Sequence, residues 1–322
     1  MTRHFCTFFD KNFLARGLAL YRSLEEHCQD FTIHMLCMDE ESFVVLKALN
    51  LDKVRLLRVS DVEDERMRAV KSTRTHVEYI WMFGAQLSLH MLEHNPNMDM
   101  VTYLDADMYF YSSPDPIYKE FSGRSVMIIP HRYSNSNLHR EKTSGIYNVG
   151  MMVFRNDHNA LECLRWWKDR VIEWCYNRYE DGKFGDQLYL NDWPTRFSGV
   201  HVLSHEGANV APWNVARYTF SQKDGSLIGK DKISGRVFPL IFYHFHGLKI
   251  YITGNSKGSG KPRIRPYPIT IHERAVYRQY ITALQRSYDD ICSIEPTWVF
   301  GTVAKIGVAR IAKQYITVLL TR

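Results

Sequence analysis

Two aspartates, Asp105 and Asp107, stand one residue apart and are the residues of this chain best suited to bind a metal ion. The apolar run 101–104 before them predicts a buried strand, and aromatic residues follow them at 109–110. In open α/β sheets ligands lie at such strand ends, where two carboxylates can converge on one hard cation. We therefore predict a divalent metal ion here, with a phosphate group on its far side. The alternative is a solvated turn or a helix cap, which the apolar neighbours disfavour.

Further polar clusters follow the aspartates along the chain. Asn148 opens a predicted strand, where it could be a turn residue. Asp186 and Gln187 open a predicted helix, where Asp186 could simply be an N-cap. His244 and His246 close a strand on the same face, and imidazole together with carboxylate suits Mn²⁺. The alternative for this pair is two structural histidines.

Composition limits the class of protein. With 322 residues, 45% of them hydrophobic and 13% aromatic, the chain is long enough for one large globular domain plus an appendage. No G-x-G-x-x-G follows the first predicted strand and no P-loop motif occurs, so phosphates must be held in another way. The six cysteines form no C-x-x-C pair, which predicts reduced thiols of a cytoplasmic protein.

Membrane association is expected at the surface only. No apolar run approaches the ~18 residues that span a bilayer. The net charge is +6, and the segment 303–322 carries four basic and no acidic residues among apolar ones. We predict that this tail lies on an anionic membrane surface, which would make the protein peripheral on the inner face of the cytoplasmic membrane. A nucleic-acid partner is not expected.

The apolar periodicity predicts a mixed, mostly parallel sheet flanked by helices. Strands are expected at 5–9, 31–38, 54–59, 101–104, 125–129, 146–154, 200–203 and 237–246, and helices at 14–27, 75–94, 158–178 and 183–194. Residues 251–268 are rich in Gly, Ser, Lys and Pro. We therefore predict one α/β domain over 1–255 and a linker with a basic, amphipathic helical extension over 256–322.

The ordered set of motifs resembles the GT-A fold nucleotide-sugar glycosyltransferases, in particular family 8 and the bacterial capsule and lipopolysaccharide sugar transferases. The resemblance covers about residues 3–250 and depends on the order of the N-terminal strand and helix, Asp105-Ala106-Asp107, Asn148-Val149-Gly150, Asp186-Gln187 and the late His-Gly-Lys cluster. It implies a single Rossmann-like domain. The activity it implies is transfer of a hexose-type sugar, with retention, from a nucleotide-diphosphate sugar, most often a UDP-sugar.

The resemblance also implies roles for individual residues. Asp105 and Asp107 would bind Mn²⁺ or Mg²⁺ against the donor diphosphate, with Asp105 also near the ribose. His244 would complete the metal shell, with His246 as a rival, and Lys249 would meet the phosphate, although it lies two residues after Gly247 where the family usually has three. The remaining implied roles are catalysis beneath the donor sugar for Asp186, Gln187 and Asn148, and donor binding for Phe8, Phe9, Asp10 and Arg74. Asn148 would act there as a hydrogen-bond donor to sugar hydroxyls.

Three predictions concern the tryptophans and the rival functions. Trp166, Trp167 and Trp174 have the spacing of helix core residues, whereas Trp213, in a Pro-Trp-Asn loop, is a candidate for stacking on the acceptor, a glycan or glycolipid. A haloacid-dehalogenase-like, Mg²⁺-dependent phosphohydrolase is the first alternative, since that family also uses Asp-x-Asp after a strand. A catalytically silent sugar-binding protein is the second.

Overall fold

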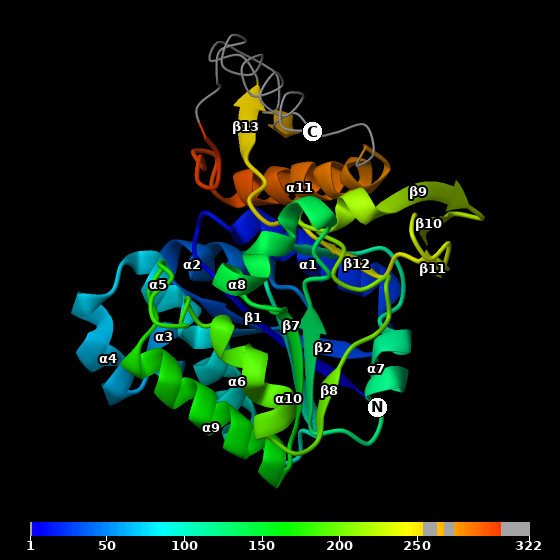
Figure 1. Cartoon of the computed structure of the whole chain (residues 1–322). Coiled ribbons are helices and arrows are strands. Elements are labelled where there is room, and N and C mark those ends of the chain that lie inside the picture. The colour runs from blue at the N-terminus through cyan, green and yellow to red at the C-terminus, as the bar shows by residue number, and fades with distance from the viewer. Residues whose placement is uncertain (1, 254–262, 267–273, 304–322) are drawn as a thin grey trace.

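A seven-stranded sheet forms the centre of the protein (Figure 1), in a computed structural model that describes residues 2–253, 263–266 and 274–303. All neighbouring strands are parallel except that one strand, β7, runs antiparallel to both of its neighbours. The predicted fold class, a mixed but mostly parallel α/β sheet flanked by helices, is confirmed. In sheet order the strands are β3 (Val54–Arg58), β2 (Phe31–Cys37), β1 (Arg3–Phe9), β4 (Met100–Leu104), β7 (Tyr147–Arg155), β6 (Val126–Pro130) and β8 (Val200–Val202).

Both faces of this sheet are buried under helices. In β7, Met151 and Val153 belong to the core on one face, whereas Met152 and Phe154 belong to the core on the other, as the alternation of side chains in a strand requires. The first face is covered by α1 (Leu14–His27), α2 (Glu40–Leu49) and α7 (Asp115–Phe121), and α11 (Arg274–Ile294) packs on the outer side of α1 and α2. The second is covered by α3 (Val59–Val62), α4 (Glu65–Val70), α5 (His76–Trp81), α6 (Phe83–His94), α9 (His158–Glu173) and α10 (Trp193–Arg196).

Two predicted helices differ from the structure. The helix expected over 75–94 is divided into α5 and α6, because the Met82 N–H bonds to the Tyr79 carbonyl three residues back and tightens the chain at that turn. The helix expected over 158–178 ends at Glu173, where Trp174 is extended. Arg74 donates to the Ile172 carbonyl at 3.1 Å in this last turn, so a cation stabilises the helix end.

Two predicted segments are shorter or interrupted. The strand expected over 237–246 is two strands in different sheets, β11 (Val237–Pro239) and β12 (Phe242–His244), because Pro239 has no N–H with which to continue the ladder. The helix expected over 183–194 is absent before residue 188. Helical turns occur only in the 3-10 helix η3 (Leu188–Asp192) and in α10.

Several elements were not predicted from the sequence. Besides α2, they include a hairpin made of β9 (Tyr218–Lys223) and β10 (Ser226–Asp231), which pairs with β11. Its turn residues Asp224 and Gly225 both have positive φ, and an Asp-Gly pair between alternating residues is the signal that identifies such a turn. The other elements that were not predicted are the helices α3, α4 and α7, β5 (Met108–Phe110), α8 (Glu141–Ser144), the pair β13 (Ile250–Thr253) and β14 (Arg263–Pro266), and the 3-10 helices η1 (Lys71–Thr73), η2 (Asn135–Arg140) and η4 (Val215–Arg217).

The C-terminal helix α11 packs on the main body. Its Tyr280 ring stacks on Phe245 with 3.7 Å between centroids, and the Tyr111 hydroxyl donates to the Val276 carbonyl. This helix lies within the segment 256–322 and shares the core that contains α1. The basic tail and its membrane contact fall on residues 304–322, which lie outside the described residues.

Two further observations concern the cysteines and the helices. All six cysteines are free thiols and all but Cys292, which is partly exposed, are buried. Among residues 2–253 and 274–303, none of the helices combines the length and the apolar character that a membrane span needs.

Candidate metal and donor site

The two aspartates lie where β4 ends. The Asp105 N–H donates to the Gly150 carbonyl of the neighbouring strand at 2.8 Å, and the chain then turns into β5. β5 pairs antiparallel with β12, which places His244 opposite Met108. The Phe245 N–H donates to the Asp107 carbonyl at 2.8 Å. This pairing brings a histidine from late in the chain beside the aspartate pair.

The side chains of this group form a cluster of oxygen and nitrogen donors. His244 Nε2 lies 3.0 Å from Asp107 Oδ1 and 3.5 Å from Asp105 Oδ2. One ligand atom each of Asp107, His244 and His246 can be chosen so that all three lie within 4.8 Å of one another. Carboxylate and imidazole donors at this spacing fit Mn²⁺, and both histidines of the predicted pair are in reach of the same ion.

The charges of the cluster depend on burial and on the histidine. Burial, followed by the neighbouring Asp107 charge, raises the pKa of Asp105. Burial acts in the same direction on Asp107, but the His244 imidazole outweighs it and lowers the pKa of Asp107 to about 2. His244 itself is 2% exposed, and its pKa is raised because Asp107 outweighs the effect of burial. Asp107 is therefore ionised across the ordinary pH range, as a metal ligand must be.

Asp186 and Gln187 reach the same region from a turn. Gly185 adopts a φ of 52°, and the Trp167 Nε1–H donates to the Asp186 carbonyl at 2.9 Å, which holds this turn against α9. Burial and the nearby Asp105 carboxylate raise the pKa of Asp186 to about 8. Asp186 caps no helix, because Gln187 is the residue that precedes η3. A protonated carboxyl group thus lies beside an ionised cluster.

Asn148 connects these two parts of the site. Its Oδ1 accepts from the Gly150 N–H at 3.0 Å and lies 3.3 Å from His244 Nδ1. Its Nδ2 donates to Gln187 Oε1 at 3.2 Å. The structure therefore brings the two aspartates, His244, Asn148 and Gln187 together, although the sequence separates them widely.

The three N-terminal candidates lie at the end of β1. Phe8 is partly buried, with its ring 5.5 Å from that of Tyr103, whose hydroxyl donates to Asp105 Oδ1 at 2.6 Å. Phe9 is 2% exposed and is a core residue. Asp10 accepts from the Asn12 N–H at 2.9 Å. Phe8 therefore contacts Tyr103, which is hydrogen-bonded to Asp105.

Arg74 and Lys249 occupy different surroundings. Besides its bond to the α9 carbonyl, the Arg74 guanidinium lies 4.0 Å above the Tyr176 ring, so its contacts are with protein. Lys249 is exposed and follows Leu248, whose carbonyl accepts from buried Arg16 at 2.9 Å. The role of Arg74 in donor binding and that of Lys249 in phosphate binding stay predictions.

Among the tryptophans, Trp167 is fully buried in the core and Trp174 is nearly so, as expected. Trp213 is 6% exposed, and its ring lies 5.2 Å from that of His244 and 5.7 Å from that of His246. It therefore packs against the histidines of the cluster. Sequence reasoning assigned no role to Tyr103 or Gly150, although both stand inside the motifs that it singled out.

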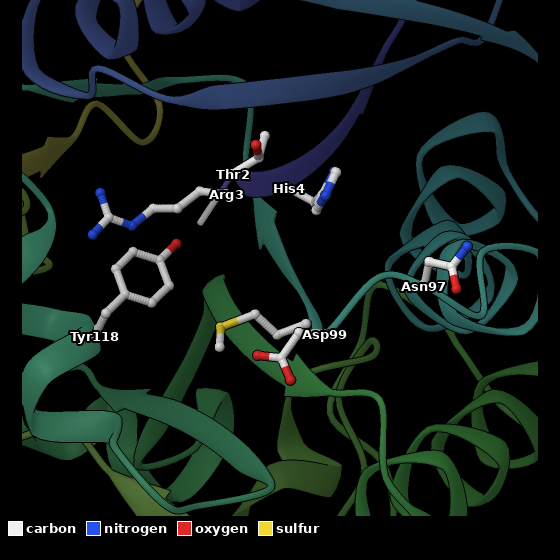
Figure 2. Close-up of a pocket in the computed structure, with 7 residues that line it drawn as sticks. Thr2, Arg3, His4, Asn97, Asp99 and Tyr118 are labelled. Atoms are coloured by element: carbon white, nitrogen blue, oxygen red, sulfur yellow. The ribbon is translucent and has the colours of Figure 1, made fainter.

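A separate pocket of about 390 Å³ opens at the other edge of the sheet, at the amino ends of β1 and β4. Figure 2 shows Arg3, His4, Asp99 and Tyr118 around it. None of its lining residues is a predicted site residue. The predicted chemistry and this pocket thus lie at opposite edges of the sheet.

Two Bacillus subtilis (strain 168) proteins are similar to this chain over most of its length. The uncharacterized protein YfnF is 37% identical over 256 residues, which are 78% of this chain and 83% of YfnF. The uncharacterized protein YfnD is 30% identical over 309 residues, which are 95% of this chain and 96% of YfnD. This chain belongs to their family. Its sequence matches no model of a known protein family.

Solved structures with a similar fold are glycosyltransferases. Mouse xyloside xylosyltransferase 1 is 17% identical, with 77% of this chain and 98% of that chain covered at a TM-score of 0.48. The galactosyltransferase LgtC, solved with donor and acceptor sugar analogs, is 15% identical, with 76% and 87% covered at a TM-score of 0.46.

Proposed function

We propose that this protein is a metal-dependent glycosyltransferase of the GT-A type that moves a hexose-type sugar from a nucleotide-diphosphate sugar, with UDP-sugars favoured, to a glycan or glycolipid. The observation that carries the proposal is the cluster of Asp107, His244 and His246 beside Asp105 at the carboxyl end of β4. The ordered motifs of the sequence support the same activity. Transfer with retention follows from the family resemblance.

Different residues in and around the cluster would bind different parts of the donor. Asp107, His244 and Asp105 would hold Mn²⁺ or Mg²⁺, with His246 available from the exposed side. When bound, the metal stabilises the negative charge that develops on the departing nucleoside diphosphate. Lys249, exposed just beyond β12, would approach the same diphosphate, and Phe8 would border the nucleotide.

The turn with Asp186 and Gln187 faces the reacting end of the donor in this proposal. The Asp186 carboxyl keeps its proton at neutral pH, so it would donate a hydrogen bond to the sugar without adding charge beside Asp105. The acceptor hydroxyl would attack the anomeric carbon while the bond to the diphosphate breaks, and its proton would pass to the departing diphosphate oxygen. Trp213, in contact with both histidines, is the aromatic residue that borders this space.

The phosphohydrolase alternative requires Asp186 as a ligand of Mg²⁺. Within the described part of the chain, the metal-binding group is instead Asp107 with two histidines. Histidine beside carboxylate favours Mn²⁺ over Mg²⁺, which prefers oxygen ligands. These ligands therefore favour the transferase over the phosphohydrolase.

The test is a thermal-shift screen against UDP-, GDP- and other nucleotide sugars, each with MnCl₂ or with EDTA, followed by measurement of nucleotide release. We expect at least one donor to stabilise the protein only when Mn²⁺ is present, and to be hydrolysed slowly. The absence of any metal-dependent stabilisation across the panel would refute the proposal. Phosphate release from a phosphomonoester, abolished in Asp105→Asn, would favour the phosphohydrolase.

The place of action follows from the acceptor class. Polysaccharide or glycolipid synthesis would occur on the cytoplasmic side, with the protein peripheral on the inner face of the cytoplasmic membrane. The basic segment 303–322 would supply that contact. Truncation after residue 303 is expected to leave donor hydrolysis intact and to weaken sedimentation with anionic vesicles.

A further inference from the structure

We propose that Asn148 is a positioning residue that keeps a proton on Nδ1 of His244 and so presents the Nε2 lone pair to the metal ion. The proposal rests on the metal-dependent function proposed above. It assigns Asn148 contacts with protein groups on both sides of its amide, where the sequence had suggested contacts with sugar hydroxyls.

The orientation of the Asn148 amide follows from a backbone group. The Gly150 N–H can only donate, so the atom that it meets at 3.0 Å must be the Oδ1 of Asn148. Nδ2 then points the other way, to Gln187 Oε1 at 3.2 Å. Gln187 in turn donates through Nε2 to the Ser144 carbonyl. In this orientation the side-chain amide oxygens of Asn148 and Gln187 each accept a hydrogen bond, and their amide nitrogens each donate one.

The same oxygen determines which imidazole nitrogen carries the proton. His244 Nδ1 lies 3.3 Å from Asn148 Oδ1, and an oxygen that only accepts requires a donor at Nδ1. The ionised Asp107 carboxylate likewise only accepts, so in the metal-free protein a ring with a proton on each nitrogen satisfies both oxygens. When a metal ion takes the place of the Nε2 proton, Nδ1 keeps its proton on Asn148 and the lone pair is on Nε2. That nitrogen lies 3.0 Å from Asp107 Oδ1 and 3.5 Å from Asp105 Oδ2. A hydrogen bond to the far nitrogen is the common way in which proteins orient a metal-binding histidine.

Packing holds the ring in the same position. A Cβ atom on Gly150 would lie 2.5 Å from Asn148 Oδ1 and 2.7 Å from His244 Nδ1, so the absence of a side chain there is what lets the ring approach. On another side the Trp213 ring meets His244 edge to face at 5.2 Å. The Asn148-Val149-Gly150 motif thus supplies both the acceptor and the space for His244.

The test compares an asparagine variant that lacks the acceptor with one that keeps it. Asn148→Leu removes Oδ1, whereas Asn148→Asp retains an oxygen toward Gly150 and His244. Titration of the purified protein with MnCl₂ alone, followed by the EPR signal of free Mn²⁺, should give a dissociation constant about 10- to 100-fold higher for Asn148→Leu. Asn148→Asp should bind at least as tightly as the wild type.

Asn156→Leu is the matched control, since it also removes a hydrogen-bonded asparagine amide, whose Nδ2 donates to the Met98 carbonyl at 3.1 Å, but at the opposite end of β7. It should not alter Mn²⁺ affinity. Unchanged affinity in Asn148→Leu, or an equal loss in Asn148→Leu and Asn148→Asp, would overturn the proposal. If Asn148→Leu does not fold, Asn148→Ser, which is too short to reach His244, replaces it.

The two proposals fail in different ways. If wild type and Asp107→Asn both fail to bind Mn²⁺, the metal-dependent function fails. If the wild type binds Mn²⁺ and Asn148→Leu binds it equally well, the positioning role of Asn148 alone fails.

Discussion

The two edges of the central sheet hold their polar groups in different ways. At the carboxyl end of β4 and the amino end of β7, Asp107, Asn148 and His244 are between 2% and 7% exposed and are joined by hydrogen bonds of definite direction. At the amino ends of β1 and β4, Arg3 pairs with Asp115 across solvent-exposed side chains, and Asp99, 38% exposed, pairs with Arg155 at 3.1 Å.

This difference distinguishes the candidate metal site from the solvent-exposed pocket at the other edge. Polar groups cost free energy when buried unless partners compensate, so a buried, fully connected cluster of carboxylate, amide and imidazole is retained for its chemistry. Exposed ion pairs contribute about 0–1 kcal/mol and occur on any surface. The pocket of Figure 2 has the volume, but the opposite edge has the groups that can bind a metal ion.

The largest expected difference between the edges comes from neutralising one aspartate at each. Asp107→Asn removes a charged ligand and should lower Mn²⁺ affinity and donor hydrolysis by more than ~100-fold. Asp99→Asn, at the other edge, should leave both unchanged, because only its ion pair with Arg155 is lost. Mn²⁺ titration and nucleotide release measure the two effects. Equal losses in the two variants would show that the edges do not differ as described.

Gly150→Ala tests whether metal binding at the carboxyl end of β4 needs free space beside His244 as well as the ligands themselves. The added methyl group collides with Asn148 and His244, so we expect Mn²⁺ affinity to fall about 10- to 100-fold and stability to fall by about 1–3 kcal/mol. Gly229→Ala in β10 is the control, since its methyl group meets the Phe238 ring far from the cluster. It should lower stability in urea unfolding without altering metal affinity. An equal effect of the two variants on Mn²⁺ binding would contradict the prediction.

Asp186→Asn should reveal the raised pKa of Asp186 in metal-free protein. Above about pH 4 the unfolded chain releases the Asp186 proton, whereas the folded protein keeps it up to about pH 8. The wild type therefore loses stability over this window, by at most ~1.4 kcal/mol per pH unit, and the variant does not. Urea unfolding in EDTA should show that the free energy of unfolding of the variant, relative to that of the wild type, is higher at pH 8 than at pH 5. A constant difference between the two pH values would rule out the raised pKa.

The smallest effect is expected at the edge formed by the amino ends of β1 and β4. Tyr118→Phe removes a hydrogen bond of 2.7 Å between the Tyr118 hydroxyl and Thr102 but keeps the ring that lies under Arg3. We expect a loss of ~1 kcal/mol in unfolding free energy and no change in Mn²⁺ binding. A change in metal affinity would mean that the two edges are coupled through the sheet.

Much of the sheet could be predicted from local patterns, because strands buried on both faces are continuous apolar runs and β1, β4 and β7 are of this kind. The β9–β10 hairpin and the two-part strand over 237–246 were missed. In both, a local signal was present, Asp224-Gly225 in one and Pro239 in the other, but polar residues and a long apolar run concealed it.

The sequence by itself determined that a buried strand ends at Asp105-Ala106-Asp107 and that amide and imidazole donors follow in order, because residue type and apolar periodicity are local properties. Only the tertiary structure decided that His244 meets Asp107, since the β5–β12 register depends on packing between distant segments. It also decided that the Asn148 oxygen faces His244, because the Gly150 N–H leaves that amide one orientation.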